Sequence, residues 1–413
     1  MLKYFFLSVL ILVGCSKKDL STVSLKDEQQ NLSVRVLLLK NMNKISLKGS
    51  SAWRITQDID SQPSSLFAPA ADNFEISLSN GSFAVGEKKF DCDQLTIAPQ
   101  NPFIFNLNGN LFRGKLALIT NQDGSSFDVI NIVGLESYLA GVVGAEMPAY
   151  WESTALEAQA VCSRTYCLYI KRNFGKDRSW DVTATQANQV YLGMRGETQS
   201  VRRAVNKTKG MILVCGQSQG RQEIFPAYFC SSCGGFTESS QAVFGGDFFE
   251  PLKGVRCDYC QLVAKEFFWQ NLKFDKSEIS LKLIKRYPVL ENLENIIEII
   301  PSKQSVFQIK TGKDISTLSR LTFLKLIGSN GQTSYLKAED FRLAIDPTGA
   351  IFKSTVCKIA DANGKLLITE GRGFGHGCGL CQCGAQALAR FYNKSASQIL
   401  SYYFPNSQIE YVR

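Results

Sequence analysis

The chain has 413 residues, of which 45% are hydrophobic and 20% charged, the composition of a folded protein long enough for two or three packed domains. Its formal net charge of +9 comes from lysines and arginines scattered along the sequence. Without a basic stripe, this charge argues against a nucleic-acid-binding protein. Beyond the N-terminus, no stretch approaches the roughly 20 apolar residues of a membrane-spanning helix.

The first 14 residues have the layout of a secretory signal, with Lys3 before an apolar run from residue 4 to 13. The following Leu-Val-Gly-Cys resembles the lipobox of bacterial lipoproteins, which implies lipidation of Cys15. The alternatives are an ordinary signal peptide or an uncleaved anchor. We therefore expect a lipoprotein signal peptide over 1–14, a polar tether over 15–31, and a membrane-anchored lipoprotein of the bacterial envelope that faces the periplasm or the cell exterior.

Short runs of β-forming residues follow at 33–39, 74–78, 116–119 and 127–133, separated by Gly, Asn, Asp and Pro. They predict a β-rich N-terminal region over 32–130. We recognise no catalytic constellation in it.

Residues 134–173 predict two helices with a carboxylate between them. Apolar residues at helical spacing indicate a first helix that Pro148 ends, and Thr154 with Glu157 suggests a capping box at the start of a second. Glu146 lies between them among Met147, Pro148, Tyr150 and Trp151. Desolvation there favours the neutral carboxyl that a general acid needs. The alternative is that Glu146 caps the second helix or is solvated at a turn.

This block resembles the stage II sporulation protein D / LytB (SpoIID/LytB) family, whose members carry L-E-x-Y-L-x-G-V-V-x-x-E-M-P and then A-x-x-A-Q-A-x-x-x-R-T-Y. The matching residues here are Leu135, Glu136, Tyr138, Leu139, Gly141, Val142, Val143, Glu146, Met147, Pro148, Ala155, Ala158, Gln159, Ala160, Arg164, Thr165 and Tyr166. The resemblance implies that Glu146 is the catalytic acid/base of a peptidoglycan lytic transglycosylase. It also implies that Tyr150, Arg164, Gln189 and Tyr191 bind the glycan.

Two CxxC turns, Cys230 with Cys233 and Cys257 with Cys260, have the spacing of a structural Zn²⁺ site. The alternatives are two disulfides in an oxidising envelope, or unligated thiols. Four cysteine ligands leave no open coordination position, so the metal would hold a loop without activating water. The related family usually has His where Cys230 stands.

The last informative block, 371–389, is rich in glycine and contains His376, the single histidine of the chain. It resembles the family motif G-R-G-x-G-H-G-V-G-x-S-Q-x-G-A, which implies that Arg372, His376 and Gln382 line the sugar groove. Three alternatives stay open. These are a Cys/His nucleophilic pair, a second metal site made by His376 with the three nearby cysteines, and a structural histidine in a glycine turn. The three cysteines are Cys378, Cys381 and Cys383.

We therefore expect an α+β fold, with a β-rich scaffold, a two-helix catalytic unit and a four-cysteine zinc-knuckle loop. The catalytic core would span 131–264, an inserted β-rich region 265–346, and a C-terminal segment completing the core 347–413. The expected reaction cleaves between N-acetylmuramic acid and N-acetylglucosamine, on glycan stripped of stem peptides, and forms 1,6-anhydro-N-acetylmuramic acid. One carboxyl group suffices because the muramyl C6 hydroxyl is an internal nucleophile.

The alternative function is a non-catalytic protein that binds peptidoglycan and enhances an N-acetylmuramoyl-L-alanine amidase. Either activity would serve cell-wall remodelling, for instance in cell division. The expected partners are glycan strands, a cell-wall amidase and the membrane through the N-terminal lipid, with no nucleic acid.

Overall fold

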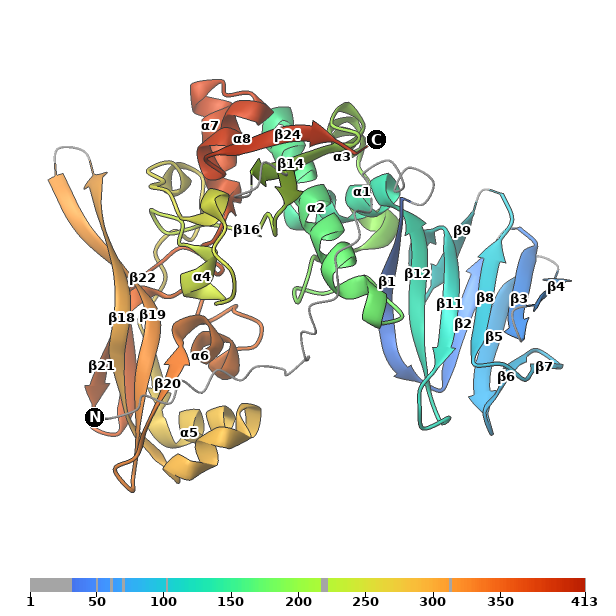
Figure 1. Ribbon diagram of the computed structural model, residues 1–413, viewed down its shortest axis with the longest axis horizontal. Coiled ribbons are helices and arrows are strands. Elements are labelled where there is room, and N and C mark those ends of the chain that lie inside the picture. The colour runs from blue at the N-terminus through green and yellow to red at the C-terminus, as the bar shows by residue number, and fades with distance from the viewer. Residues whose placement is uncertain are drawn as a thin grey trace.

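The structure is a computed structural model (Figure 1), which describes residues 32–412 except 50, 60, 61, 69, 70, 102, 217–221, 312 and 313. The predicted signal peptide, the lipidation site Cys15 and the tether lie outside the described residues. Within the described ranges, no helix combines the length and the apolar character needed to cross a membrane.

The N-terminal region consists of two antiparallel sheets packed face to face, at one end of the molecule (Figure 1). One has the strand order β13-β1-β12-β11-β8-β3-β4 and the other β10-β9-β2-β5-β6-β7, with only the short β13 parallel to its neighbour. Phe83 and Phe127 meet edge to face across the interface, with ring centroids 5.4 Å apart.

The four predicted strand runs are confirmed; the other strands of this region were not predicted. The bounds are β1 Ser33–Met42, β2 Lys44–Gly49, β3 Trp53–Ile59, β4 Gln62–Ala68, β5 Ala71–Ser79, β6 Ser82–Val85, β7 Lys88–Phe90, β8 Gln94–Pro99, β9 Ile104–Leu107, β10 Asn110–Arg113, β11 Lys115–Thr120, β12 Phe127–Gly134 and β13 Val182–Thr183.

Strand β12 leads directly into the central helical part, where α1 (Leu135–Glu146) and α2 (Ser153–Phe174) confirm the two predicted helices. The predicted capping box is wrong. Helix α2 begins one residue before Thr154, with Glu152 at the N-cap, so Thr154 lies inside the first turn. The Glu157 carboxylate instead pairs with Lys207 Nζ at 2.8 Å. Helix α3 (Gln199–Lys207) and the sheet of β14 (Met211–Gly216), β15 (Gln222–Ile224) and β24 (Ser407–Tyr411) complete this part.

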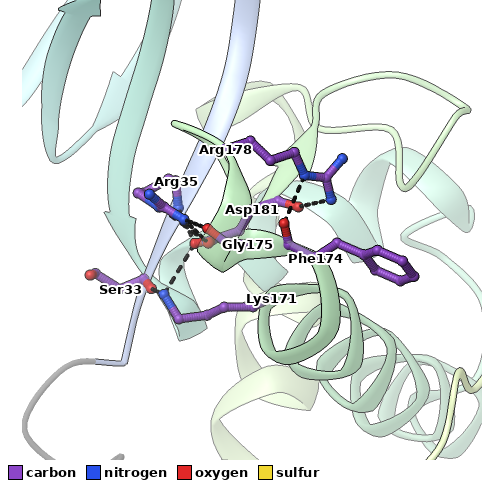
Figure 2. A network of polar contacts seen from close by, with 7 residues as sticks. All are labelled: Ser33, Arg35, Lys171, Phe174, Gly175, Arg178 and Asp181. Atoms are coloured by element: carbon purple, nitrogen blue, oxygen red, sulfur yellow. Dashed lines mark hydrogen bonds and ion pairs between the residues drawn. The ribbon is translucent and has the colours of Figure 1, made fainter. Parts of the chain in front are cut away.

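A buried carboxylate holds the C-terminal end of α2 against the first strand (Figure 2). Asp181 is fully buried and accepts from Arg35 Nη2 at 2.7 Å and from Lys171 Nζ at 3.1 Å. The Lys171 ammonium also donates to the Ser33 carbonyl. Burial of an unpaired carboxylate costs free energy, and here two cations compensate the charge of Asp181. This network therefore joins the sandwich to the helical part.

The region after residue 265 forms a second body with its own apolar core around Phe341, Leu324 and Phe352. It contains a long hairpin, β18 (Ile296–Thr311) with β19 (Asp314–Gly328), where the sequence indicated short strands. Strand β17 pairs with β22, so segments from both sides of position 346 share one sheet. The remaining elements are β17 Leu272–Asp275, α5 Lys276–Arg286, β20 Thr333–Lys337, α6 Ala338–Ile345, β21 Val356–Ala362 and β22 Lys365–Arg372.

The C-terminal segment returns to the helical part through α7 (Gln382–Tyr392) and α8 (Ala396–Tyr403). Strand β16 (Phe229–Cys230) pairs in parallel with β23 (Leu380–Cys381), which brings the first CxxC turn beside the glycine-rich block. Helix α4 (Ser240–Val243) and the 3-10 segments η1 Gly175–Asp177, η2 Gly193–Gly196, η3 Glu250–Leu252, η4 Cys260–Leu262 and η5 Pro288–Leu293 connect these parts. The chain is thus a mixed α/β protein with several β-rich sheets and several helices.

Candidate functional site

Glu146 is the last residue of α1, which ends because Pro148 cannot continue it. Its carboxylate is half-buried and accepts a hydrogen bond from the Val190 backbone N–H at 2.8 Å. Burial raises the pKa of this carboxyl above its ordinary value of 4.5, and the hydrogen bonds from Val190 and Gln382 partly oppose the shift. A partly accessible carboxyl with a raised pKa can hold the proton that a general acid donates.

Gln382 connects this carboxyl to the glycine-rich block. It is the first residue of α7 and is buried, and its side-chain amide donates to Gln159 Oε1 at 3.4 Å and lies close enough to the Glu146 carboxyl to lower its pKa. Gln159 lies on α2 and in turn donates to Ser163 Oγ at 3.0 Å. Helices α1 and α2, which are neighbours in the sequence, are therefore connected through Gln382 to α7, 223 residues beyond Gln159, and two predicted site residues, Glu146 and Gln382, lie close together.

The loop between α1 and α2, which follows Glu146 in the chain, carries an exposed aromatic residue. Tyr150 is 79% exposed, and the Glu152 backbone N–H donates to Gln386 Oε1 on α7 at 2.9 Å. The loop is therefore held against α7 while the Tyr150 ring stays accessible. Such a ring can stack on a sugar face, and the role of Tyr150 in glycan binding stays a prediction.

Three other predicted glycan-binding residues have internal partners instead. Arg164 has no exposed surface, and its Nε and Nη2 donate to the two oxygens of the Glu136 carboxylate at 3.0 and 2.6 Å. Gln189 is fully buried between the Tyr138 hydroxyl and the Ser163 carbonyl, and the Tyr191 hydroxyl donates to Asn131 Oδ1 at 3.1 Å. All three are buried against these internal partners and support the helices around Glu146, and their contact with glycan stays a prediction.

His376 lies in an aromatic pocket. Its Nδ1 accepts from the Cys378 backbone N–H at 3.0 Å, and its ring meets Phe244 and Tyr228 edge to face, with centroids 5.1 and 6.0 Å apart. Burial lowers the pKa of His376 to about 4, so the imidazole is neutral near pH 7. A neutral imidazole can exchange hydrogen bonds with hydroxyl groups but cannot contribute a cation.

One alternative for the glycine-rich block, a Cys/His nucleophilic pair, finds little support, whereas the bond from the Cys378 backbone N–H to His376 fits a structural histidine in a glycine turn. Burial raises the pKa of the Cys378, Cys381 and Cys383 thiols, so none is a ready thiolate for a Cys/His pair. Arg372 lies on β22, where its guanidinium stacks over Phe268 at 5.1 Å. This pairing attaches Arg372 to the second body and leaves the predicted groove contact untested.

The CxxC cysteines converge in a way that the sequence spacing did not predict. Cys233, Cys257 and Cys260 gather with Cys381, and their four buried sulfur atoms lie within 4.8 Å of one another. Cys230 is outside this set, although it is the strand partner of Cys381. The cysteines that converge therefore differ from the predicted set at one position, because β16 places Cys230 beside the cluster and β23 carries Cys381 into it.

The geometry of this cluster fits a tetrahedral metal. The sulfurs of Cys233 and Cys260 are 3.8 Å apart. Zinc–sulfur bonds of about 2.3 Å give a sulfur–sulfur separation of roughly 3.8 Å in a tetrahedron, whereas a disulfide is about 2.05 Å long. All four cysteines are free thiols in this structure. The residues present therefore fit a closed zinc site better than a pair of disulfides.

Arg320 on β19 is a connecting residue that sequence reasoning missed. It is fully buried and donates to the carbonyls of Cys233, at 2.6 Å, and His376, at 3.4 Å. Its guanidinium also lies over the Phe236 ring, 5.3 Å from the centroid. The second body thus holds both motif loops through one side chain.

These features define a class of protein: a mixed α/β chain in which a helix-end carboxyl, an amide from a glycine-rich block and a cysteine cluster are brought together. Comparison with known proteins gives the family. The family model described as "Stage II sporulation protein" matches residues 123–215, which include α1 and α2. An uncharacterised protein of Brachyspira hyodysenteriae is 33% identical over 301 residues, covering 73% of this chain and 72% of that protein.

Two Bacillus subtilis proteins are also similar. "Stage II sporulation protein D" is 28% identical over 67% of this chain and 74% of its own length. "Amidase enhancer" is 27% identical over 81% of this chain, which spans about half the length of that relative. The chain belongs to the SpoIID/LytB family.

Proposed function

We propose that this protein is an envelope lytic transglycosylase that cleaves peptidoglycan glycan strands between N-acetylmuramic acid and N-acetylglucosamine. The observation that carries the proposal is the Glu146 carboxyl, which is half-buried, has a raised pKa and is oriented by Val190 and Gln382. The related proteins named for sporulation and for amidase enhancement support a role connected with the cell wall.

The chemistry follows from one carboxyl group. Protonated Glu146 donates its proton to the glycosidic oxygen as that bond breaks, and the leaving N-acetylglucosamine keeps the proton. The muramyl C6 hydroxyl then attacks C1 and loses its proton to the Glu146 carboxylate. This closes the 1,6-anhydro ring and restores the acid. Most hydrolytic glycosidases need a second carboxylate to activate water or attack carbon, but an intramolecular hydroxyl with a high effective molarity replaces it.

The surroundings of Glu146 suit this role. The Val190 N–H and the Gln382 amide stabilise the carboxylate formed after proton donation, and burial restores the preference for the acid. Tyr150 offers an exposed ring for a sugar face. The neutral His376 and Arg372 remain candidates for hydrogen bonds farther along the glycan, preferably one already stripped of stem peptides.

Glu146→Gln tests the proposal. The amide keeps the size of the side chain and accepts from Val190, but it cannot exchange a proton. We expect the variant to bind peptide-free glycan strands as the wild type does while losing release of 1,6-anhydromuramyl products by at least ~100-fold. Equal product yields from the two proteins would remove Glu146 from the mechanism.

A second function is supported by one comparison. The relative named "Amidase enhancer" matches more of this chain than the other Bacillus subtilis protein does. In this alternative the protein binds glycan strands and stimulates an N-acetylmuramoyl-L-alanine amidase without cutting glycan itself. Stimulation of such an amidase by Glu146→Gln as strong as by the wild type, with no anhydro product from either protein, would favour it.

The cellular setting is part of the proposal. A lipid on Cys15 would tether the protein at a membrane of the bacterial envelope, so that it acts on nearby peptidoglycan during wall remodelling. The measurement for this part is the localisation of a Cys15→Ser variant, described below.

A further inference from the structure

We propose that Cys381, together with Cys233, Cys257 and Cys260, forms a structural zinc site that fixes the start of α7 and thereby positions Gln382 against Glu146. This ligand set differs from the two CxxC pairs that the sequence indicated. It also places a ligand where the related family motif has serine. The proposal concerns a metal site and stands independently of glycan cleavage.

The first support is the geometry of the sulfur atoms. Four buried sulfurs lie within 4.8 Å of one another, and the separation of 3.8 Å between the sulfurs of Cys233 and Cys260 equals the edge of a zinc–sulfur tetrahedron. Four thiolates close the coordination sphere, so the metal is structural. A divalent ion also neutralises charge that would otherwise be costly to bury.

The second support is the set of donors around the sulfurs. The Cys233 backbone N–H donates to Cys381 Sγ at 3.2 Å, and the Tyr403 hydroxyl lies 3.1 Å from Cys257 Sγ. Hydrogen bonds of this kind to ligating atoms orient them and stabilise the charged form. Tyr403 is buried on α8, so its hydroxyl is shielded from solvent where it meets the Cys257 sulfur.

The third support is the close approach of α7. A Cβ atom at Gly384 would overlap the Tyr403 hydroxyl and lie 2.9 Å from Cys257 Sγ. Only glycine therefore lets the first turn of α7 pack against the cluster. The family motif also has glycine at this position, and here the reason is the proximity of a cysteine sulfur.

The consequence for the candidate site follows from the chain itself. Cys381 directly precedes Gln382, whose side chain contacts Glu146 and Gln159. A metal bound to Cys381 fixes the backbone one residue before this contact. Gln382 is thus a positioning residue, and the zinc site links the CxxC turns to the carboxyl group.

The experiment compares Cys381→Ser with the matched control Cys230→Ser. Both residues are buried and are partners in the β16–β23 pairing, so the two substitutions remove similar thiols from adjacent positions. Zinc content would be measured by elemental analysis, and the number of sulfur ligands by X-ray absorption and by the charge-transfer bands of the cobalt-substituted protein. We expect the wild type and Cys230→Ser to hold close to one metal with four sulfurs. Cys381→Ser should bind zinc at least ~100-fold more weakly, because loss of a ligand costs more than the ~10–100-fold of outer contacts.

If Cys381→Ser does not fold, the Cys230→Ser variant still shows which of the two cysteines binds the metal. Four sulfur ligands in Cys230→Ser exclude Cys230 as a ligand. A drop to three sulfurs in Cys230→Ser, or a folded wild type without metal, would overturn the proposal. Hydrogen exchange provides the link to Gln382. Removal of zinc should speed exchange at residues 382–386, and unchanged exchange there would refute the positioning role whether or not the protein cleaves glycan.

Discussion

Replacement of Arg164 by Met distinguishes a structural arginine from a substrate-binding one. The Arg164 guanidinium has no exposed surface, forms two hydrogen bonds with Glu136 and donates to the Met211 carbonyl at 3.0 Å. It thereby joins α2 to α1 and to β14. Methionine fills most of the same volume, so the substitution removes the charge and the hydrogen bonds without opening a large cavity.

The expected cost is large because the change leaves partners unsatisfied. Removing one member of a buried ion pair typically costs about 3–5 kcal/mol. The Glu136 side chain keeps 23% of its surface exposed and can be partly hydrated, so we expect the lower end, about 3 kcal/mol. At ~2–4 °C per kcal/mol for a folding unit of 150–250 residues, this corresponds to a decrease in Tm of about 6–12 °C.

The assay is thermal unfolding followed by circular dichroism, together with glycan binding below the transition. The matched control is Arg202→Met, because Arg202 is 55% exposed and Glu197, which it meets at 3.6 Å, keeps Arg113 as a partner at 2.9 Å, so its loss should cost about 0–1 kcal/mol. An unchanged Tm in Arg164→Met combined with weaker glycan binding would refute the structural assignment and restore Arg164 to the groove.

Four further substitutions test a buried arginine, the titration of two site residues and the lipid anchor. Arg320→Met should destabilise the protein by about 3 kcal/mol or more, because three backbone carbonyls lose a buried donor, and a melting temperature equal to that of the wild type would contradict the connecting role. The folded-state pKa of His376 lies below its unfolded value, so stability should fall as pH decreases from 6.5 to about 4, and His376→Gln should flatten that part of the profile measured by denaturant titration. Glu146 acts in the opposite direction: its raised pKa lowers stability as pH rises above 4.5, so Glu146→Gln should be at least as stable as the wild type at pH 7, and a clear loss of stability would argue against a desolvated carboxyl. Cys15→Ser should move the protein from the membrane fraction to the soluble envelope fraction, and unchanged membrane association would contradict the lipobox interpretation.

The sequence predicted local elements well where one physical signal dominated. The apolar spacing between Leu135 and Val143 and the stop at Pro148 place α1 correctly, and a run of β-forming residues places β12. The capping-box prediction failed because the start of α2 is set by tertiary contacts. Glu152, whose N–H is bound by Gln386 from a helix more than 200 residues away, occupies the N-cap.

The candidate site was predicted in part, because motif matching identifies residues but not their exposure. Glu146 and Gln382 were both predicted, and their contact could not be read from positions far apart in the chain. Arg164, Gln189 and Tyr191 belong to the same motifs but point into the core, where they hold the helices that carry Glu146. A family motif contains supporting residues as well as those that touch a ligand, and burial separates the two.

The cysteine cluster shows a similar limit. CxxC spacing predicts that the two cysteines of one turn lie together, as Cys257 and Cys260 do. It could not show that the parallel pairing of β16 with β23 brings Cys381 into the position expected for Cys230, because that pairing joins segments about 150 residues apart.

Cleavage of glycan with an internal nucleophile activated by Glu146 can be tested by mass spectrometry of products formed in ¹⁸O-labelled water. We expect muramyl ends lighter by one water molecule than the hydrolytic product, with no ¹⁸O, from the wild type and none of this product from Glu146→Gln. Muramyl reducing ends that carry one ¹⁸O atom, or strands left uncut by the wild type, would contradict it.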